Sequence, residues 1–122
     1  MTTSAIINLI YTYAAMYNVD PQIALAVAKI ESGLNETKIG DIGEIGLFQV
    51  RPEYTWYSKK ALQNPYINTM VGIQRIKEEQ ELCHFKDPIH SLICYNYGRT
   101  NAKRVRFPHR FPYVLKINKE LK

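Results

Sequence analysis

Residues 29–52, KIESGLNETKIGDIGEIGLFQVRP, constrain the fold and the chemistry of this chain more than any other stretch. They begin in the last turns of an apolar helical run, pass through Glu31, and end in a glycine-spaced segment, residues 43–49. At helical spacing Glu31 shares its face with the aliphatic residues Ile23, Ala24, Val27 and Ala28. Because that face is the one a helix buries, the carboxyl group is predicted to point inward rather than to water.

Two effects should keep this carboxyl group protonated. Removal from water disfavours its charged form, and the C-terminal end of a helix carries partial negative charge that disfavours a second negative group. We therefore expect the pKa of Glu31 to be raised, as an acid catalyst near neutral pH requires. The alternative is that Glu31 only ends the helix with its carboxylate in solvent, which is the usual position of a helix glutamate.

The hydrophobic patterns along the chain predict an all-α protein. Thr3 or Ser4 can cap a first helix, and a cap followed by proline precedes three more, at residues 20–21, 64–65 and 87–88. The second helix ends at Gly33 and should be the buried central one; the third runs to about residue 82 with residues 77–81 outward; the fourth ends at Gly98. A short helix is expected at residues 46–50 and a last one at 112–121. No segment alternates for long enough to predict a strand.

Length and composition exclude several classes of protein. A chain of 122 residues, 46% apolar and 22% charged, predicts one globular domain over residues 1–122. No apolar run reaches the roughly 18 residues of a membrane span, and the N-terminal stretch lacks the basic region of a signal peptide. Cys83 and Cys94 are too few for a disulfide framework, and we expect two buried thiols. No Cys/His cluster has metal-ligand spacing, so no metal or cofactor is expected.

The net charge of +5 is unevenly distributed. Five basic residues fall within residues 99–110, namely Arg99, Lys103, Arg104, Arg106 and Arg110. Such a segment favours a polyanionic partner, and nucleic acid, anionic lipid and bacterial cell wall all qualify.

Three short motifs make the interpretation more specific. They are Glu31-Ser32, then Gly46-Leu47-Phe48-Gln49, then Tyr95-Asn96-Tyr97-Gly98. In this order and at similar spacings they resemble the three signature motifs of the soluble lytic transglycosylase family, whose lysozyme-like α-domain cleaves peptidoglycan in a cleft beside its central helix. The resemblance covers about residues 19–114, and Pro52 matches the proline that usually follows the glutamine motif.

The resemblance implies a role for each matched residue. Glu31 would be the single catalytic acid/base, Ser32 would help to hold it, and Tyr95 would place its hydroxyl against it. Gln49 would hydrogen-bond the bound sugar, Gly46 would let the backbone approach, and Asn96 would brace the site or touch substrate. An amide suits sugar hydroxyls and N-acetyl groups because it both donates and accepts hydrogen bonds.

The family reaction needs no second carboxylate. The 6-hydroxyl of N-acetylmuramic acid attacks its own anomeric carbon, which cleaves the β-1,4 bond to N-acetylglucosamine and leaves a 1,6-anhydro product. A hydrolase on the same scaffold would instead use Asp41 or Glu44 to activate water. An alternative of another class is a basic helical module that binds nucleic acid through residues 99–110, but it leaves Glu31 and the glycine-spaced motif without a function.

Other positions leave alternatives open. Arg51 stands where the family commonly has methionine, and it either meets a substrate carboxylate or is solvated. Trp56 and Tyr57 either stack on sugar or pack in the core or at a rim, and Tyr97 either adds a wall to the cleft or packs. Gly40 replaces a substrate-contacting serine of many members, so no role is carried over to it. A monomeric wall enzyme without a signal peptide is typical of a bacteriophage product, carried in the virion or released through a holin at lysis.

Overall fold

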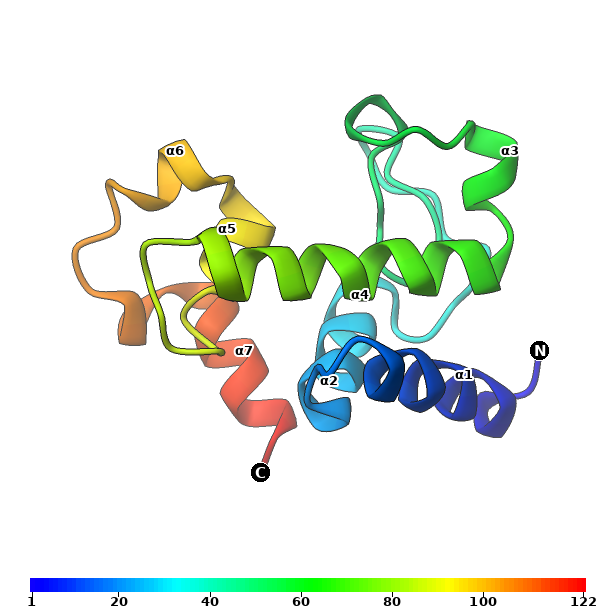
Figure 1. Cartoon of the computed structure of the whole chain (residues 1–122), viewed down its shortest axis with the longest axis horizontal. Helices are drawn as coiled ribbons and strands as arrows, with labels where there is room; N and C mark the ends of the chain where they lie inside the picture. The colour runs from blue at the N-terminus through cyan, green and yellow to red at the C-terminus, as the bar shows by residue number, and fades with distance from the viewer.

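The computed structural model covers all 122 residues and contains seven α-helices, two short 3₁₀ turns and no strand, which confirms the all-α prediction. None of the helices is long and apolar enough to cross a membrane. Figure 1 shows α4 running across the middle of the molecule, with α1 and α2 below it. The elements are α1 Thr3–Met16, α2 Pro21–Ser32, η1 Pro52–Tyr54, α3 Lys59–Leu62, α4 Pro65–Leu82, α5 Leu92–Tyr97, α6 Arg99–Ala102, η2 Pro108–Arg110 and α7 Pro112–Glu120.

Helix α2 is the buried central helix that its composition predicted. The Asp20 side chain accepts a hydrogen bond from the Gln22 amide at 2.8 Å, Pro21 occupies the first turn, and Gly33 ends the helix with φ of 62°. Every residue from 23 to 28 is buried, and α1 and α7 pack against this helix. The core therefore fixes the position of this helix and of its last turn, which carries the partly buried Glu31.

Residues 46–50 do not form the short helix that the sequence analysis expected. They make a tight turn, closed by two backbone hydrogen bonds between Ile45 and Val50 at 2.9 and 3.0 Å. Gly46 and Gln49 have φ of 77° and 50°, in the left-handed region, which a right-handed helix does not allow. The expectation was wrong because contacts with α4, which is distant in the sequence, decide the backbone here.

Helix α4 is the platform on which this turn lies. The buried Asn68 side chain accepts from the Phe48 amide at 2.9 Å and donates to the carbonyls of Ile45 and Leu62 at 2.7 and 2.9 Å. Phe48 is fully buried against Gly72, where an added Cβ would lie 2.3 Å from the Phe48 ring. The absence of a side chain at position 72 therefore leaves the space that the ring of Phe48 requires.

Other helix boundaries differ from those expected. Thr2 caps α1, one residue earlier than predicted. Asp87 accepts hydrogen bonds from the amides of Ile89 and His90 as a cap should, yet the chain continues in turns and α5 begins only at Leu92. The helices α3 and α6 were not predicted, because a four-residue helix is too short to show a hydrophobic period.

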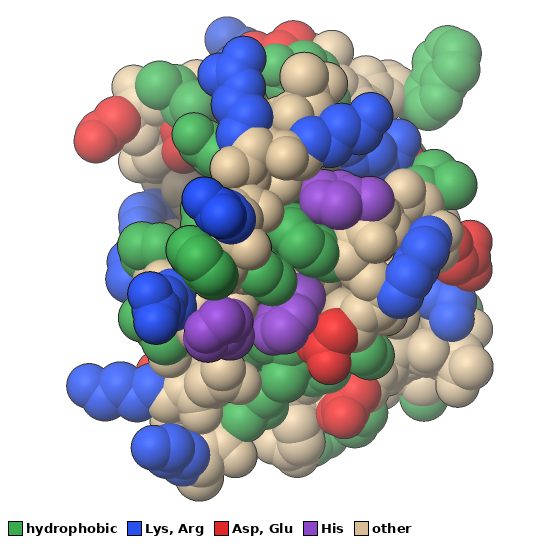
Figure 2. All heavy atoms as spheres, turned by 90° about the vertical axis from the view of Figure 1, so that its left-hand side faces the viewer, with side chains coloured by type: hydrophobic (Ala, Val, Ile, Leu, Met, Phe, Trp, Pro, Cys, Tyr) green, Lys and Arg blue, Asp and Glu red, His purple; other side chains and the backbone are tan.

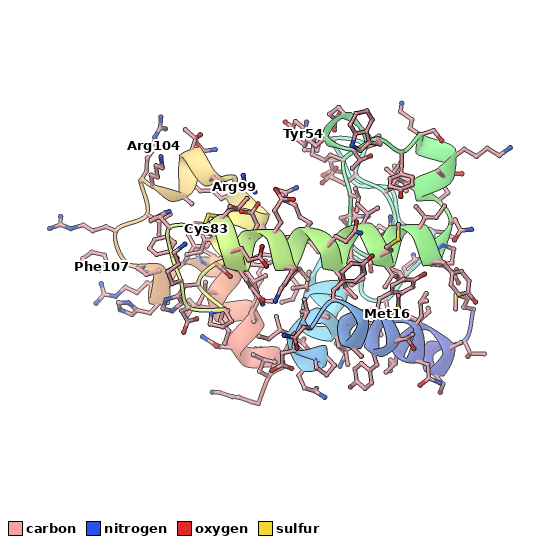
Figure 3. All side chains as sticks on the ribbon, in the orientation of Figure 1. Met16, Tyr54, Cys83, Arg99, Arg104 and Phe107 are labelled. Carbon is pink, nitrogen blue, oxygen red and sulfur yellow. A yellow bond between two sulfur atoms is a disulfide. The ribbon has the colours of Figure 1, made fainter.

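The two cysteines are buried as expected, but they are not free thiols. Cys83, next to the end of α4, forms a disulfide with Cys94 in α5, with their Cα atoms 6.0 Å apart. Figure 3 labels Cys83 at this end of α4. His84 lies within 4.8 Å of both sulfur atoms, but sulfurs bonded to each other are not thiolates that could bind a metal. The disulfide instead links α4 to the helix that carries Tyr95 and Asn96.

Reduction of this disulfide should lower the free energy of unfolding. Opening a loop of this size releases entropy in the unfolded chain equivalent to about 2–3 kcal/mol. Denaturant unfolding with and without a thiol reductant measures the difference, and the Cys83→Ser/Cys94→Ser variant, on which reductant has nothing to act, is the control. Equal unfolding midpoints for the oxidised and reduced protein would contradict the prediction.

Candidate active site

A cleft of about 880 Å³ opens above α4. The loop between α2 and α3 forms one side, and α5 and α6 form the other (Figure 1). Tyr54 and Arg99 mark the two sides in Figure 3. Of the six residues to which the resemblance assigned a role, the cleft brings together Glu31, Gln49, Tyr95 and Asn96. Three segments far apart in the chain therefore face one space.

Glu31 lies in the last turn of α2, partly buried, at the wall of this cleft. Burial raises the pKa of its carboxyl group, and the negative charge of Glu44 acts in the same direction. A hydrogen bond from Tyr113 and the positive charges of Lys38 and Lys116 oppose the shift, but the pKa remains above its ordinary value. The carboxyl group thus retains a proton more readily than an exposed glutamate does.

Tyr113 is the residue of the site that the sequence analysis missed. Its hydroxyl donates to Oε2 of Glu31 at 2.8 Å, across 82 positions of sequence. The pKa of Tyr113 is raised by burial and by the negative charge of Glu31, so the phenol stays protonated and able to donate. Its position at a buried site of α7, four residues before Ile117, was a signal for a core residue only.

Tyr95 does not make the expected hydrogen bond to Glu31. Its hydroxyl donates instead to the carbonyl oxygen of Phe48 at 2.9 Å, and the Arg75 guanidinium lies over its ring, 5.5 Å from the centroid. The pKa of Tyr95 is raised by burial and then by the charge of Glu31, so this phenol also stays protonated. The position against the carboxylate is taken by Tyr113 from α7, and Tyr95 fixes the peptide that precedes Gln49.

Gln49 reaches the cleft from the turn with both donors of its amide already used. Its Nε2 donates to the carbonyls of Gly46 at 2.9 Å and Lys38 at 3.1 Å, which leaves Oε1 without a donor from the protein. Gln49 is therefore arranged to accept a hydrogen bond from a ligand rather than to donate one. Gly46 itself is buried, and an added Cβ would lie 2.5 Å from Nδ2 of Asn68.

Ser32 and Asn96 differ in their access to the cleft. The Ser32 side chain is buried and its hydroxyl donates to the Ala28 carbonyl within α2 at 3.0 Å, with no hydrogen bond to the Glu31 carboxylate. Asn96 is exposed on the cleft wall, and its side-chain amide makes no hydrogen bond with the protein. Of these two side chains, only that of Asn96 can reach a ligand.

The two carboxylates considered for a hydrolase, Asp41 and Glu44, also differ in their access to the cleft. Glu44 lines the cleft with Glu31, and its carboxylate accepts from the Ile42 amide at 2.9 Å. Asp41 is exposed and does not line the cleft. Gly40 makes room beside Glu44, because a Cβ there would lie 2.5 Å from Oε1 of Glu44 and 2.7 Å from that of Gln49.

The cleft rim carries the positions whose roles the sequence left open. Arg51 is half exposed, paired with Glu53 at 2.9 Å and placed over the Tyr54 ring. Trp56 is fully exposed and Tyr57 half-buried, and both line the cleft. Tyr97 lines it too, with its ring 5.6 Å from that of Phe111.

The sequence analysis expected residues 77–81 of α4 to face outward, but one of them, Glu79, is buried. Glu79 is 2% exposed and accepts from Nε of Arg75 at 3.2 Å and from Nε of Arg99 at 2.7 Å. A carboxylate can be buried at this site because two guanidinium groups pair with it. The network connects α4 to α6 and holds Arg75 over the Tyr95 ring.

The family model for the Transglycosylase SLT domain matches residues 8–108. The match covers most of the chain and includes all three motifs, with Glu31, Gln49 and Tyr95. The chain belongs to the transglycosylase SLT family. Membership indicates cleavage of peptidoglycan of the lytic transglycosylase type, and it agrees with the all-α fold. The Tyr113 contact lies beyond the matched residues and comes from the geometry alone.

The two tyrosines of this SLT domain should affect the pH dependence differently. Tyr113→Phe removes a hydrogen bond that stabilises the Glu31 carboxylate, so the pKa of Glu31 should rise further. The alkaline limb of the profile of kcat/KM against pH then moves to higher pH. The loss of a hydrogen bond to a charged group lowers kcat about tenfold or more.

Tyr95→Phe is the matched control, because it removes the bond to Phe48 and leaves the Glu31 carboxylate with its partner. This variant should bind substrate less well with the alkaline limb unmoved. Turnover of peptidoglycan fragments over a range of pH measures both. Equal displacement of the limb in the two variants would exclude Tyr113 as the group that sets the acidity of Glu31.

Proposed function

We propose that this protein is a lytic transglycosylase in which Glu31 is the sole acid and base. It would cleave the β-1,4 bond between N-acetylmuramic acid and N-acetylglucosamine and form a 1,6-anhydromuramoyl product. The observation that carries the proposal is a partly buried carboxyl group with a raised pKa, in a cleft, with one phenol donating to it. Acid catalysis at a glycosidic oxygen needs such a group.

In the proposed reaction, protonated Glu31 gives its proton to the glycosidic oxygen as the bond to the anomeric carbon breaks. The resulting carboxylate takes the proton of the 6-hydroxyl, whose oxygen forms the new bond to that carbon. Glu31 regains the acid form without a water molecule being consumed. Tyr113 stabilises the carboxylate between these steps, and Lys38 and Lys116 favour the same state.

The substrate would be held by groups that lack partners within the protein. Oε1 of Gln49 can accept from a sugar hydroxyl or an N-acetyl N–H, and the Asn96 amide can donate and accept. The left-handed backbone at Gln49 is retained because Asn68 and Tyr95 bond the residue before it. In this proposal Gly46 and Ser32 do not touch the substrate. The Gly46 carbonyl holds the Gln49 amide, and the hydroxyl of Ser32 bonds the Ala28 carbonyl in the last turns of the helix that carries Glu31.

A hydrolase on the same scaffold is the second candidate. Glu44 is favoured over Asp41 as its second carboxylate, since only Glu44 lines the cleft with Glu31. Glu44 would then activate a water molecule for attack on the anomeric carbon. The two candidates differ by one water in the product, and the composition of the product decides between them.

Mass spectrometry of the muropeptides released from purified peptidoglycan tests the reaction directly. A lytic transglycosylase should release fragments that end in 1,6-anhydromuramic acid and cannot be reduced by borohydride. Fragments heavier by one water, with a reducing end, would contradict the proposed reaction and support the hydrolase.

Glu31→Gln should abolish cleavage while the protein remains folded. Loss of a general acid and base typically costs about 100- to 10,000-fold in rate. Asp41→Asn, outside the cleft, should retain the rate of the unmodified protein, and Glu44→Gln should lose its activity only if the hydrolase is correct. Release of dye-labelled peptidoglycan measures all three. Cleavage by Glu31→Gln at the unmodified rate would eliminate both candidates.

The same variant has an expected effect on stability. A carboxyl group with a raised pKa in the folded state contributes stability below its unfolded pKa, and that contribution is lost as pH rises through the folded pKa. Glu31→Gln, which remains neutral, should therefore be at least as stable as the unmodified protein at pH 7. The difference should disappear in acid, where Glu31 is protonated in both states. Denaturant unfolding at both pH values measures it, and a less stable variant at pH 7 would contradict the raised pKa.

The origin of the protein is a separate matter. The expected bacteriophage source, with a role in opening the wall during infection or at lysis, stays a prediction, as does the monomeric state. The peptidoglycan substrate does not depend on either, because it follows from the SLT domain.

A further inference from the structure

A basic ridge lies on the segment that follows α6. We define it as Lys103, Arg104, Arg106 and Arg110, all of which are exposed. Figure 3 shows Arg104 and Phe107 at the outer edge of the molecule, and Figure 2 shows Lys and Arg side chains beside exposed apolar ones on the face at this end. The active site uses none of these residues.

No salt bridge within the chain neutralises the ridge. Residues 88–119 contain no Asp or Glu. The salt bridges of the molecule include Arg99, which pairs with Glu78 and Glu79, but no residue of the ridge. Four unpaired cations within eight residues repel one another, and an anion that bridges them relieves this repulsion.

The ridge is also ordered by an aromatic ring. The guanidinium carbon atoms of Arg106 and Arg110 lie 5.6 and 5.1 Å from the centroid of the Phe107 ring, and His109 meets the ring edge at 6.2 Å between centroids. Cation–π contacts and the fixed φ of Pro108 hold both guanidinium groups against one ring. Less side-chain entropy is then lost when both groups bind one polymer.

These contacts indicate which kind of polyanion fits. Guanidinium groups bind phosphate well, and closely spaced cations match a polymer with one charge per repeat. The ridge offers one half-exposed phenyl ring, that of Phe107, whereas proteins that bind single strands stack successive bases on several rings, and it has no amphipathic helix that could lie in a membrane surface. Neither α6 nor η2 is long enough to lie in a DNA groove. A phosphodiester chain without bases meets all these conditions.

The basic ridge follows directly in the chain on residues that line the cleft. Arg99, Thr100 and Asn101 line the cleft at α6, and the ridge begins two residues later. We propose that the basic ridge binds a phosphodiester-linked polymer of the cell wall, of the poly(glycerol phosphate) kind, and so keeps the enzyme beside its glycan strand. The assignment of the polymer to the wall rests on the proposed function; the affinity for the phosphodiester chain does not.

Fluorescence anisotropy with labelled poly(glycerol phosphate) tests the proposal. Affinity should fall by about 50-fold between about 50 and 200 mM salt, as expected for four phosphate contacts. The variant Lys103→Gln/Arg104→Gln/Arg106→Gln/Arg110→Gln should bind at least about tenfold more weakly with a smaller salt dependence. If it does not fold, as judged by circular dichroism, Lys103→Gln/Arg104→Gln leaves the Phe107 contacts intact and should lose part of the affinity.

The matched control removes the same charge elsewhere. Lys29→Gln/Lys59→Gln/Lys60→Gln/Lys122→Gln changes four exposed lysines that form no ion pair and should keep the affinity of the unmodified protein. Equally weakened binding of the polymer by both variants would overturn the proposal, because it would show that the affinity depends on the overall charge of the protein and not on the ridge. Equal or tighter binding of duplex DNA, or of phosphatidylglycerol vesicles, at the same phosphate concentration would also overturn it.

Failure of the ridge is distinguishable from failure of the proposed function. Binding is measured on Glu31→Gln protein with the free polymer, so it needs no cleavage. Release of muropeptides from peptidoglycan stripped of phosphodiester polymer should be the same for the ridge variant and the unmodified protein. A ridge variant that loses this release would show that the segment serves the cleft and not a second polymer.

Discussion

The hydrogen bond from Tyr113 to Glu31 is the contact on which the carboxyl group of this site depends, because no other group of the protein donates to that carboxylate. It joins the last turn of α2 to the first turn of α7 and links two segments 82 residues apart. Burial raises the pKa of Glu31, whereas the hydrogen bond from Tyr113 and the charges of Lys38 and Lys116 lower it. These contacts therefore stabilise opposite protonation states of the group that the proposed reaction uses as both acid and base.

The opposite wall of the cleft depends on a different set of contacts. The turn at residues 46–50 is held from below by Asn68 and from the side by the Tyr95 hydroxyl. These bonds maintain the left-handed backbone of Gln49, which costs about 1–2 kcal/mol for a residue with a side chain. Phe48 anchors the turn in the space above Gly72. In this turn, Gln49 therefore faces the cleft, and Phe48, Asn68 and Tyr95 determine its position.

Ionic contacts position the side of the cleft that α5 and α6 form. Buried Glu79 pairs with Arg75 and Arg99 and thereby connects α4, the Tyr95 ring and α6. The disulfide joins the end of α4 to α5, the helix that carries Tyr95. Beyond Arg99 the cations are no longer paired, so the molecule changes within a few residues from an internally balanced network to a surface that an external anion can neutralise.

Local patterns in the sequence were sufficient for the all-α class, for α2 between Asp20 and Gly33, for the cap of α4 and for the inward side of Glu31. The resemblance of three motifs to a known family, and not a local pattern, placed Gln49, Tyr95 and Asn96 with Glu31 on one cleft. Caps, prolines and hydrophobic periods act within a few residues, so they can be recognised without coordinates. The partner of Glu31, the turn at residues 46–50, the burial of Glu79 and the Cys83–Cys94 bond were decided by the tertiary structure. Each of these is set by a side chain that arrives from another helix, and spacing along the chain carries no information about which helix that is.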